Sequence, residues 1–312
     1  MKSLKRHLAV LLGATAMLAA CGGGGQQIDP FAPKRMIAFG DETSTIRTDG
    51  TKYTINGTDT TTKAVVCTSN AIWVQQLASR FGLVFAECNV DKLATPTARM
   101  YAAAGAKVAD VTAQIDRQFA LDGFNNKDLV TVLAGANDVM ELYAQFPAQD
   151  AGTLGNAAQA RGEQLAAQVN RIADADGRII LSTVQDMGLS PFAFKEKAAH
   201  ADADRAALLS ELSRRFNVGL RLKIRNDGHY IGLILTDELM GTMSRFPTAY
   251  GATNSADAAC LATSLPPVCT DLTLVTSATS TSHMWASDLL VGPIMHNNMA
   301  LQASNRATNN PF

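Results

Sequence analysis

The hydrophobic positions of the chain form short continuous runs that alternate with amphipathic stretches. Five apolar runs predict strands over residues 36–40, 83–85, 129–134, 178–183 and 230–235. Runs of this length that are bounded by turn residues are typical of strands buried on both faces. Between them, apolar residues recur every three or four positions, which predicts helices over residues 71–81, 108–119, 154–174, 201–226 and 287–306.

This alternation of strands and helices predicts the fold class. Right-handed crossovers between successive strands give a mostly parallel sheet with helices on both faces, so we expect an α/β protein with three α/β/α layers. Residues 45–62 are rich in Thr, Gly, Asp and Asn and predict a surface loop, and residues 247–282 predict an irregular excursion over the top of the sheet. No repeat or linker interrupts residues 35–312, so one domain is expected there.

The first twenty residues have the layout of an export signal. A basic start with Lys2, Lys5 and Arg6 precedes an apolar run over residues 8–18, which is too short to span a bilayer. The end of this segment, Leu18-Ala19-Ala20-Cys21, resembles the bacterial lipobox. The resemblance implies a signal peptide over residues 1–20, lipid attachment at Cys21 and a flexible tether over residues 21–34. The alternative is an ordinary signal with an incidental cysteine.

Composition and net charge limit the classes of partner that the protein is expected to bind. A hydrophobic fraction of 47% is sufficient for a proper core, and a formal net charge of −1 argues against nucleic acid. Gly22 after the cysteine favours, by the same resemblance, anchoring in the outer membrane of the cell envelope. The sequence indicates no cofactor and leaves the oligomeric state open.

Four cysteines follow the leader, namely Cys67, Cys88, Cys260 and Cys269. An even number in an exported protein suggests two disulfides, most simply Cys67–Cys88 and Cys260–Cys269, because each pair is close in sequence. The sequence does not fix this connectivity. A zinc site is the alternative, although the spacings lack a Cys-x-x-Cys element.

The candidate chemistry begins where the first predicted strand runs into Gly40-Asp41-Glu42-Thr43-Ser44, because open α/β sheets place their ligands at such strand ends. Further segments in the same order are Ala104-Gly105-Ala106, Gly135-Ala136-Asn137-Asp138, residues 184–191 and residues 234–260. Together these blocks resemble the GDSL (SGNH) ester hydrolases over most of the mature chain. The resemblance implies a flavodoxin-like sandwich that cleaves carboxylic (acyl) esters.

The family pattern assigns roles to several of these positions. The resemblance implies that Gly105, Asn137 and the backbone amide of residue 42 are donors to the oxyanion of the tetrahedral intermediate, where each donor contributes about 3–4 kcal/mol. Alternatively, Asn137 caps a turn after a strand. A separate alternative for Gly105 is that this glycine only permits close packing.

Two positions depart from the family pattern. Glu42 stands where the family has its nucleophilic serine. Asp288 aligns with the acid that orients the catalytic histidine, but Leu290 or Val291 occupies the position of that base. His296 falls on a second histidine of the family's last block, which is not the base.

Substitutes for the missing groups are few. Ser44 lies two residues beyond the nucleophile position, which on a helix rotates it by about 200° away from the donors. His283 and His296 are the candidates for a relocated base, and Glu42 fits a structural cap as well as a catalytic role. A further alternative is a metal site formed by three acidic side chains and one histidine, although no spacing demands it: Asp41, Glu42, Asp288 and His296.

Two functions follow from these observations. The first is a membrane-anchored ester hydrolase with a non-standard or impaired site, whose partners are the membrane, through Cys21, and an acyl-ester substrate. The second is a non-catalytic lipoprotein of the cell envelope that binds an acyl or glycan ligand in the degenerate cleft.

Overall fold

A five-stranded parallel sheet forms the centre of the protein, whose computed structural model describes residues 30–309 apart from residue 227. The strands are β1 (Arg35–Gly40), β2 (Ala98–Met100), β3 (Asp128–Leu133), β4 (Arg178–Ser182) and β5 (Ile231–Ile234). They are ordered β2-β1-β3-β4-β5, and every pairing is parallel. This is the flavodoxin-like order, which confirms the predicted fold class. The predicted signal peptide and Cys21 lie outside the described residues.

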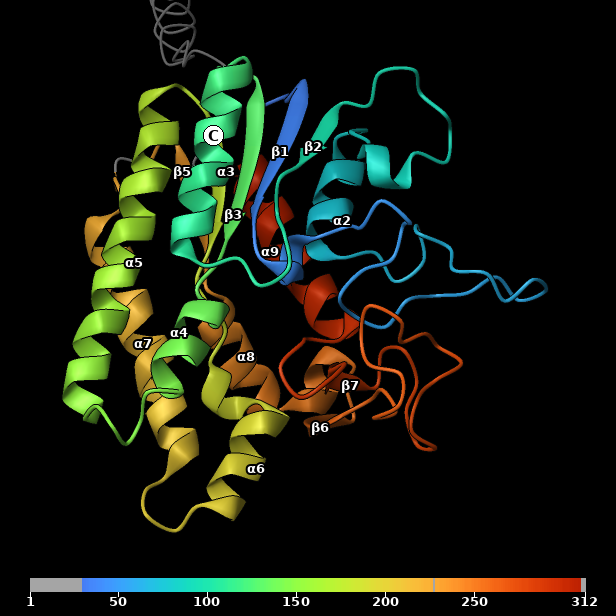
Figure 1. Ribbon diagram of the computed structural model, residues 1–312. Helices are drawn as coiled ribbons and strands as arrows, with labels where there is room; N and C mark the ends of the chain where they lie inside the picture. The colour runs from blue at the N-terminus through green and yellow to red at the C-terminus, as the bar shows by residue number, and fades with distance from the viewer. Residues whose placement is uncertain (1–29, 227, 310–312) are drawn as a thin grey trace, which may run out of the picture. The chain divides into compact units, whose positions relative to one another are not determined.

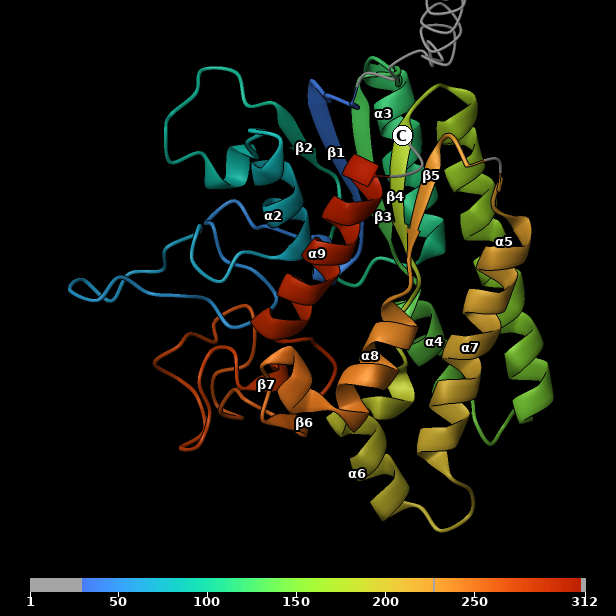
Figure 2. The same cartoon turned by 180° about the vertical axis from the view of Figure 1, so that it is seen from behind.

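Helices cover both faces of the sheet (Figures 1 and 2). One face carries α3 (Val108–Leu121), α4 (Ala136–Tyr143), α5 (Ala151–Asp174) and α7 (Arg205–Lys223). The other carries α2 (Trp73–Arg80), α8 (Thr236–Arg245) and α9 (Pro293–Asn309). Alternate residues of β1 supply the two cores, with Ile37 and Phe39 on the first face and Met36 and Ala38 on the second. Within the described residues, no helix combines the length and the apolar character needed to cross a membrane.

The predicted strand at residues 83–85 is wrong. The edge strand is instead β2, which pairs with β1 from Met36 onward. Residues 83–85 make a single bridge to it, between Phe85 and Ala98. The short helix η2 (Ala86–Cys88) follows at once, and its cysteine is tied to Cys67, so the extended segment ends before a ladder forms.

Three short helices were missed by the hydrophobic pattern, namely α4, α6 (Pro191–Ala199) and α8. Each has ten residues or fewer, so an apolar period has little room to show. For α6 a capping signal was available, because Ser190 precedes Pro191 and its hydroxyl accepts from the Ala193 amide at 3.1 Å. The last helix begins at Pro293 rather than at residue 287, since residues 286–290 close a tight turn first.

The cysteines pair as Cys67–Cys88 and Cys260–Cys269, which confirms the expected disulfides and excludes the zinc alternative. The second disulfide lies in the excursion between α8 and α9, which contains the small parallel pair β6 (Asn254–Ala258) and β7 (His283–Trp285). In Figure 1 this excursion lies beyond the lower end of the sheet, beside the loop that follows β1.

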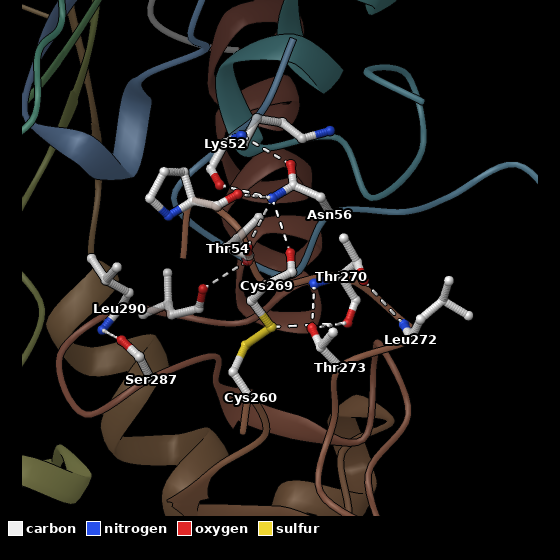
Figure 3. Close-up of a disulfide and its surroundings, with 12 residues drawn as sticks. Lys52, Thr54, Asn56, Cys260, Cys269, Thr270, Leu272, Thr273, Ser287 and Leu290 are labelled. Atoms are coloured by element: carbon white, nitrogen blue, oxygen red, sulfur yellow. Dashed lines mark hydrogen bonds between the residues drawn. A yellow bond between two sulfur atoms is a disulfide. The ribbon is translucent and has the colours of Figure 1, made fainter. Parts of the chain in front are cut away.

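Asn56 joins these two loop regions. Figure 3 shows its side-chain amide beside the Cys260–Cys269 disulfide. The Asn56 Nδ2 atom donates to the carbonyls of Pro267 at 2.8 Å and Cys269 at 3.1 Å, while its Oδ1 accepts from the Lys52 amide at 2.9 Å. Nearby, the Thr54 hydroxyl donates to the Val291 carbonyl at 2.9 Å. Asn56 is fully buried. Its side-chain amide joins segments that are more than 200 residues apart in the sequence.

Candidate functional site

The site lies at the carboxyl ends of β1 and β3, where the strand order of the sheet reverses. Gly40 ends β1 with φ of +136°, and a Cβ atom there would lie 1.9 Å from the Leu133 carbonyl oxygen. Only glycine therefore permits this approach of the two strands. The Gln114 side chain holds both backbone groups of Gly40, accepting from its N–H at 2.8 Å and donating to its carbonyl at 3.0 Å. The turn that presents residues 41 and 42 is thus rigidly placed.

Glu42 begins the short helix η1 (Glu42–Ser44). Its carboxylate accepts hydrogen bonds from Gly105 and Asn137, two of the donors that the family resemblance implies. Its Oε2 atom accepts from the Gly105 amide at 2.8 Å and from Asn137 Nδ2 at 3.0 Å. The same Nδ2 lies 3.3 Å from Oε1 and also donates to the Ala106 carbonyl at 3.2 Å. The structure therefore brings these three predicted residues together, with the carboxylate placed on the donors.

Gly105 and Asn137 reach Glu42 from different elements. Gly105 lies in the loop after β2, where its φ of +74° suits glycine and no atom occupies the space beside its Cα. Asn137 lies in the first turn of α4, just after Gly135 with φ of +132°. Added to Gly135, a Cβ would meet the ring of Phe216 at 2.6 Å, so this residue too must be glycine. The donors are fixed by backbone geometry on both sides.

Asp41 lies behind Glu42 and is completely buried. Its Oδ1 atom accepts from the Thr43 amide at 2.9 Å, while Oδ2 has no hydrogen-bond partner. Burial, followed by the neighbouring charge of Glu42, raises the pKa of Asp41 well above its usual value. These effects favour the neutral acid at Asp41, while the side chain of Glu42 lines the cleft.

Ser44 and His296 do not supply the missing nucleophile and base. Both side chains are fully buried, and both contact Trp73. The Ser44 hydroxyl accepts from Trp73 Nε1 at 3.2 Å, and His296 Nδ1 accepts from the Trp73 amide at 3.4 Å. Burial, reinforced by the positive charge of Lys52, lowers the pKa of His296 to about 3. The structure corrects both predictions, because neither side chain lines the cleft beside Glu42.

His283 is equally unsuited to act as a base. It is buried in β7, and its Nδ1 atom lies 2.8 Å from the Ser282 hydroxyl. Burial lowers the pKa of His283, and the opposing effect of Asp257 is weaker. His283 does not line the cleft beside Glu42.

Asp288 pairs with a lysine that the sequence pattern did not single out. Lys195 Nζ lies 2.7 Å from Oδ1 and 2.8 Å from Oδ2 of Asp288. Lys195 comes from α6, whose start is tied to the turn by a hydrogen bond from the Phe192 amide to the Asp288 carbonyl. Asp288, at the acid position of the family pattern, thus forms an ion pair with a lysine. The missed helix explains the missed lysine, since no element was expected at residue 195.

Glu42, Gly105 and the Lys195–Asp288 pair line one cleft of about 520 Å³. Its far wall comes from the disulfide-closed excursion and from the turn before α9, with Leu265, Leu289 and Leu290 among the apolar side chains. Cys260 belongs to this wall, and Figure 3 shows its disulfide to Cys269, whose carbonyl accepts from the Asn56 amide. The cleft lining thus combines apolar side chains with the charged groups of Glu42, Lys195 and Asp288.

The residues considered for a metal do not come together. Asp288 is paired with Lys195, and His296 is buried against Trp73. Over residues 30–309, with residue 227 left aside, no group of three or more His, Cys, Asp or Glu side chains is arranged to hold a metal ion.

Comparison with known proteins adds similarity in fold. No family model matches the chain, and no curated protein matches it. Among solved structures, a member of the lipolytic protein G-D-S-L family from Veillonella parvula is 11% identical, over 86% of this chain and 95% of that one, with a TM-score of 0.40. An acetylxylan esterase from Geobacillus stearothermophilus is 13% identical, over 89% and 95%, with a TM-score of 0.44. A lipase from a goat rumen metagenome is 15% identical, over 68% and 84%, with a TM-score of 0.43.

Proposed function

We propose that the protein is an envelope lipoprotein built on an ester-hydrolase scaffold, and that its cleft binds a small ligand without cleaving it. The observation that carries this proposal is the position of the Glu42 carboxylate on the Gly105 amide and the Asn137 side chain. An ester hydrolase needs such donors for the negative oxygen that develops in the transition state. Here the Glu42 side chain already accepts their hydrogen bonds.

The groups around Glu42 reinforce this conclusion. A developing oxyanion would lie against the Glu42 carboxylate, and like charges in such a site repel strongly. Attack by the carboxylate itself on an ester would give a reactive anhydride. Ser44 is buried beneath Trp73, and the hydroxyl of Ser287, which does line the cleft, accepts from the Leu290 amide at 3.3 Å. The cleft lining contains no histidine. Acid–base chemistry of the serine–histidine kind therefore lacks its base.

Acyl-ester hydrolysis is the competing function, because Gly105 and Asn137 still converge on one point. The test is turnover of p-nitrophenyl acetate and p-nitrophenyl octanoate by the purified chain. The parent protein and Glu42→Gln are both expected to show the uncatalysed rate. Ser44→Ala serves as the second comparison.

Each active outcome identifies a different error in the proposal. Parent turnover that disappears in Glu42→Gln but persists in Ser44→Ala would make Glu42 a catalytic group. Turnover lost only in Ser44→Ala would mean that the buried serine becomes accessible. Either result would replace the binding function by hydrolysis.

A further inference from the structure

The polarity of the cleft is opposite to that of an ester-binding site. In an ester hydrolase, N–H donors face the reacting oxygen. Here those donors are covered by Glu42, so the cleft presents a carboxylate at this point, and a carboxylate only accepts hydrogen bonds. The carbonyl and carboxylate oxygens of acyl ligands are acceptors as well, and they find no donor at this point.

Glu42 has acceptor capacity to spare. A carboxylate offers about four lone-pair positions. Two hydrogen bonds go to Oε2, whereas Oε1 receives only the long contact of 3.3 Å from Asn137. Oε1 is thus the better acceptor for a ligand that enters the cleft.

The charge of Glu42 is not balanced within the cleft lining. Its hydrogen-bond donors, a backbone amide and an asparagine side chain, are both uncharged. Lys195, which lines the same cleft, is held by both oxygens of Asp288 at 2.7 and 2.8 Å. The lysine charge is therefore committed to a different carboxylate. A cationic ligand would complete the pairing that the protein leaves open at Glu42.

The remainder of the lining calls for an apolar body on the ligand. Leu265 and Pro266 from the disulfide-closed loop line the same cleft of about 520 Å³ as Leu289 and Leu290 from the turn before α9. Leu265 is 49% exposed, so it retains apolar surface for a ligand to cover. Covering apolar area releases about 25 cal/mol per Å², which favours a hydrocarbon chain of several carbons in this place.

We propose that the cleft recognises amphiphilic amines, with the ammonium group on Glu42 and the hydrocarbon chain between Leu265 and Leu290. This inference rests on the proposed binding function and specifies its ligand class. It departs from the family expectation, because an acyl ligand would place an acceptor where the protein already has one. Charge complementarity selects the head group, and the apolar wall selects the tail.

Three probes of equal chain length test the proposal by calorimetry on the parent protein: n-octylammonium, 1-octanol and octanoate. Octylammonium is expected to bind at least about tenfold more tightly than octanoate, since the Glu42 carboxylate attracts the ammonium group and repels a second carboxylate. Glu42→Gln, which keeps the side-chain shape but removes the charge, is expected to weaken octylammonium by about tenfold and to leave 1-octanol nearly unchanged.

Two further variants separate the head from the tail. Leu265→Ser should weaken octylammonium and 1-octanol by the same factor, because it removes apolar contact alone. Glu238→Gln is the matched control, since this carboxylate lies on α8 beside Arg221, outside the cleft lining, and its loss should leave all three affinities unchanged.

The outcomes distinguish the two levels of the proposal. Octanoate binding as tightly as octylammonium would overturn the amine preference while preserving a binding cleft. Ester turnover by the parent would overturn the binding function itself. Failure of all three probes to bind would overturn both the amine preference and the binding function. If Glu42→Gln does not fold, the ranking of the three probe affinities on the parent protein still tests the amine preference.

Discussion

The carboxylate at residue 42 determines more than its own position. The Glu42 side chain is long enough to reach back onto the Gly105 amide and the Asn137 side chain, where a serine hydroxyl would leave both free. The same carboxylate adds to the burial that raises the pKa of Asp41. One side chain thus organises the hydrogen bonds and the charge at this strand end.

His296 makes the stability of the fold depend on pH. Burial lowers its pKa from an ordinary 6.5 to about 3. As the pH falls below 6.5, the unfolded chain takes up a proton that the folded chain refuses until about pH 3. The free energy of unfolding is therefore expected to fall across this window by several kcal/mol, at most about 5.

Urea unfolding between pH 7 and 3.5 measures this effect as a difference between variants. His296→Gln is expected to be less stable than the parent at pH 7 but to lose less stability on acidification. His200→Gln, at an exposed histidine, should retain the slope of the parent. Equal slopes in all three proteins would show that His296 takes up its proton without unfolding.

At the scale of elements, the long periodic segments were predictable and the short connecting ones were not. The apolar run of β3 and the periodic positions of α5 are visible in the sequence because burial is continuous along them. The position of Lys195 was not visible in the sequence, since α6 has nine residues and almost no one-sided apolar pattern. The convergence of Glu42, Gly105 and Asn137 could be expected from strand ends, whereas the reach of the carboxylate onto the donors depends on side-chain length in three dimensions.

The burial of Ser44 and His296 beneath Trp73 was equally hidden. Both residues occur in polar contexts that suggest exposure, and only the packing of α2 against α9 places them in the core. The role of Asn56 escaped for a related reason. Its partners lie more than 200 residues away, beyond the range of any local pattern.

Asn56 is expected to be the most sensitive residue of the loop region. Asn56→Ala removes the side-chain donor of the Pro267 carbonyl and one of two donors of the buried Cys269 carbonyl, whose other donor is the backbone amide of residue 56. It should lower the free energy of unfolding by about 1–3 kcal/mol. Urea unfolding measures the loss, and limited proteolysis should show faster cleavage within residues 260–274.

The matched control is Asn89→Ala, whose hydrogen bonds stay within the neighbouring turn up to Leu93. This change is expected to cost less than about 1 kcal/mol. If the two variants were equally stable, the loop and the excursion would have to be held together by the remaining contacts rather than by Asn56.

At the scale of the whole molecule, the proposed lipid anchor on Cys21 determines where the cleft operates. Cys21→Ser is expected to move the protein from the membrane fraction to the soluble fraction of a bacterial lysate, because a lipid chain supplies about 0.8 kcal/mol per buried CH₂ group. Mass spectrometry of the N-terminal peptide should show the lipid in the parent only. Gly24→Ser in the tether should alter neither result, and a Cys21→Ser protein that remained with the membrane would refute the anchor.

The hydrogen bonds of Asn56 also impose an order of assembly. Synthesis proceeds from the N-terminus, so β1, Gly105 and Asn137 emerge long before Pro267 and Cys269, which Asn56 needs as partners 211 and 213 residues later. Contacts of such separation form slowly, because a long loop must close first. A nascent chain that stops before residue 258 therefore contains the residues that hold the Glu42 carboxylate but lacks the far wall of the cleft, which residues 258–290 form. The ligand-binding cleft is completed only by the last fifth of the chain.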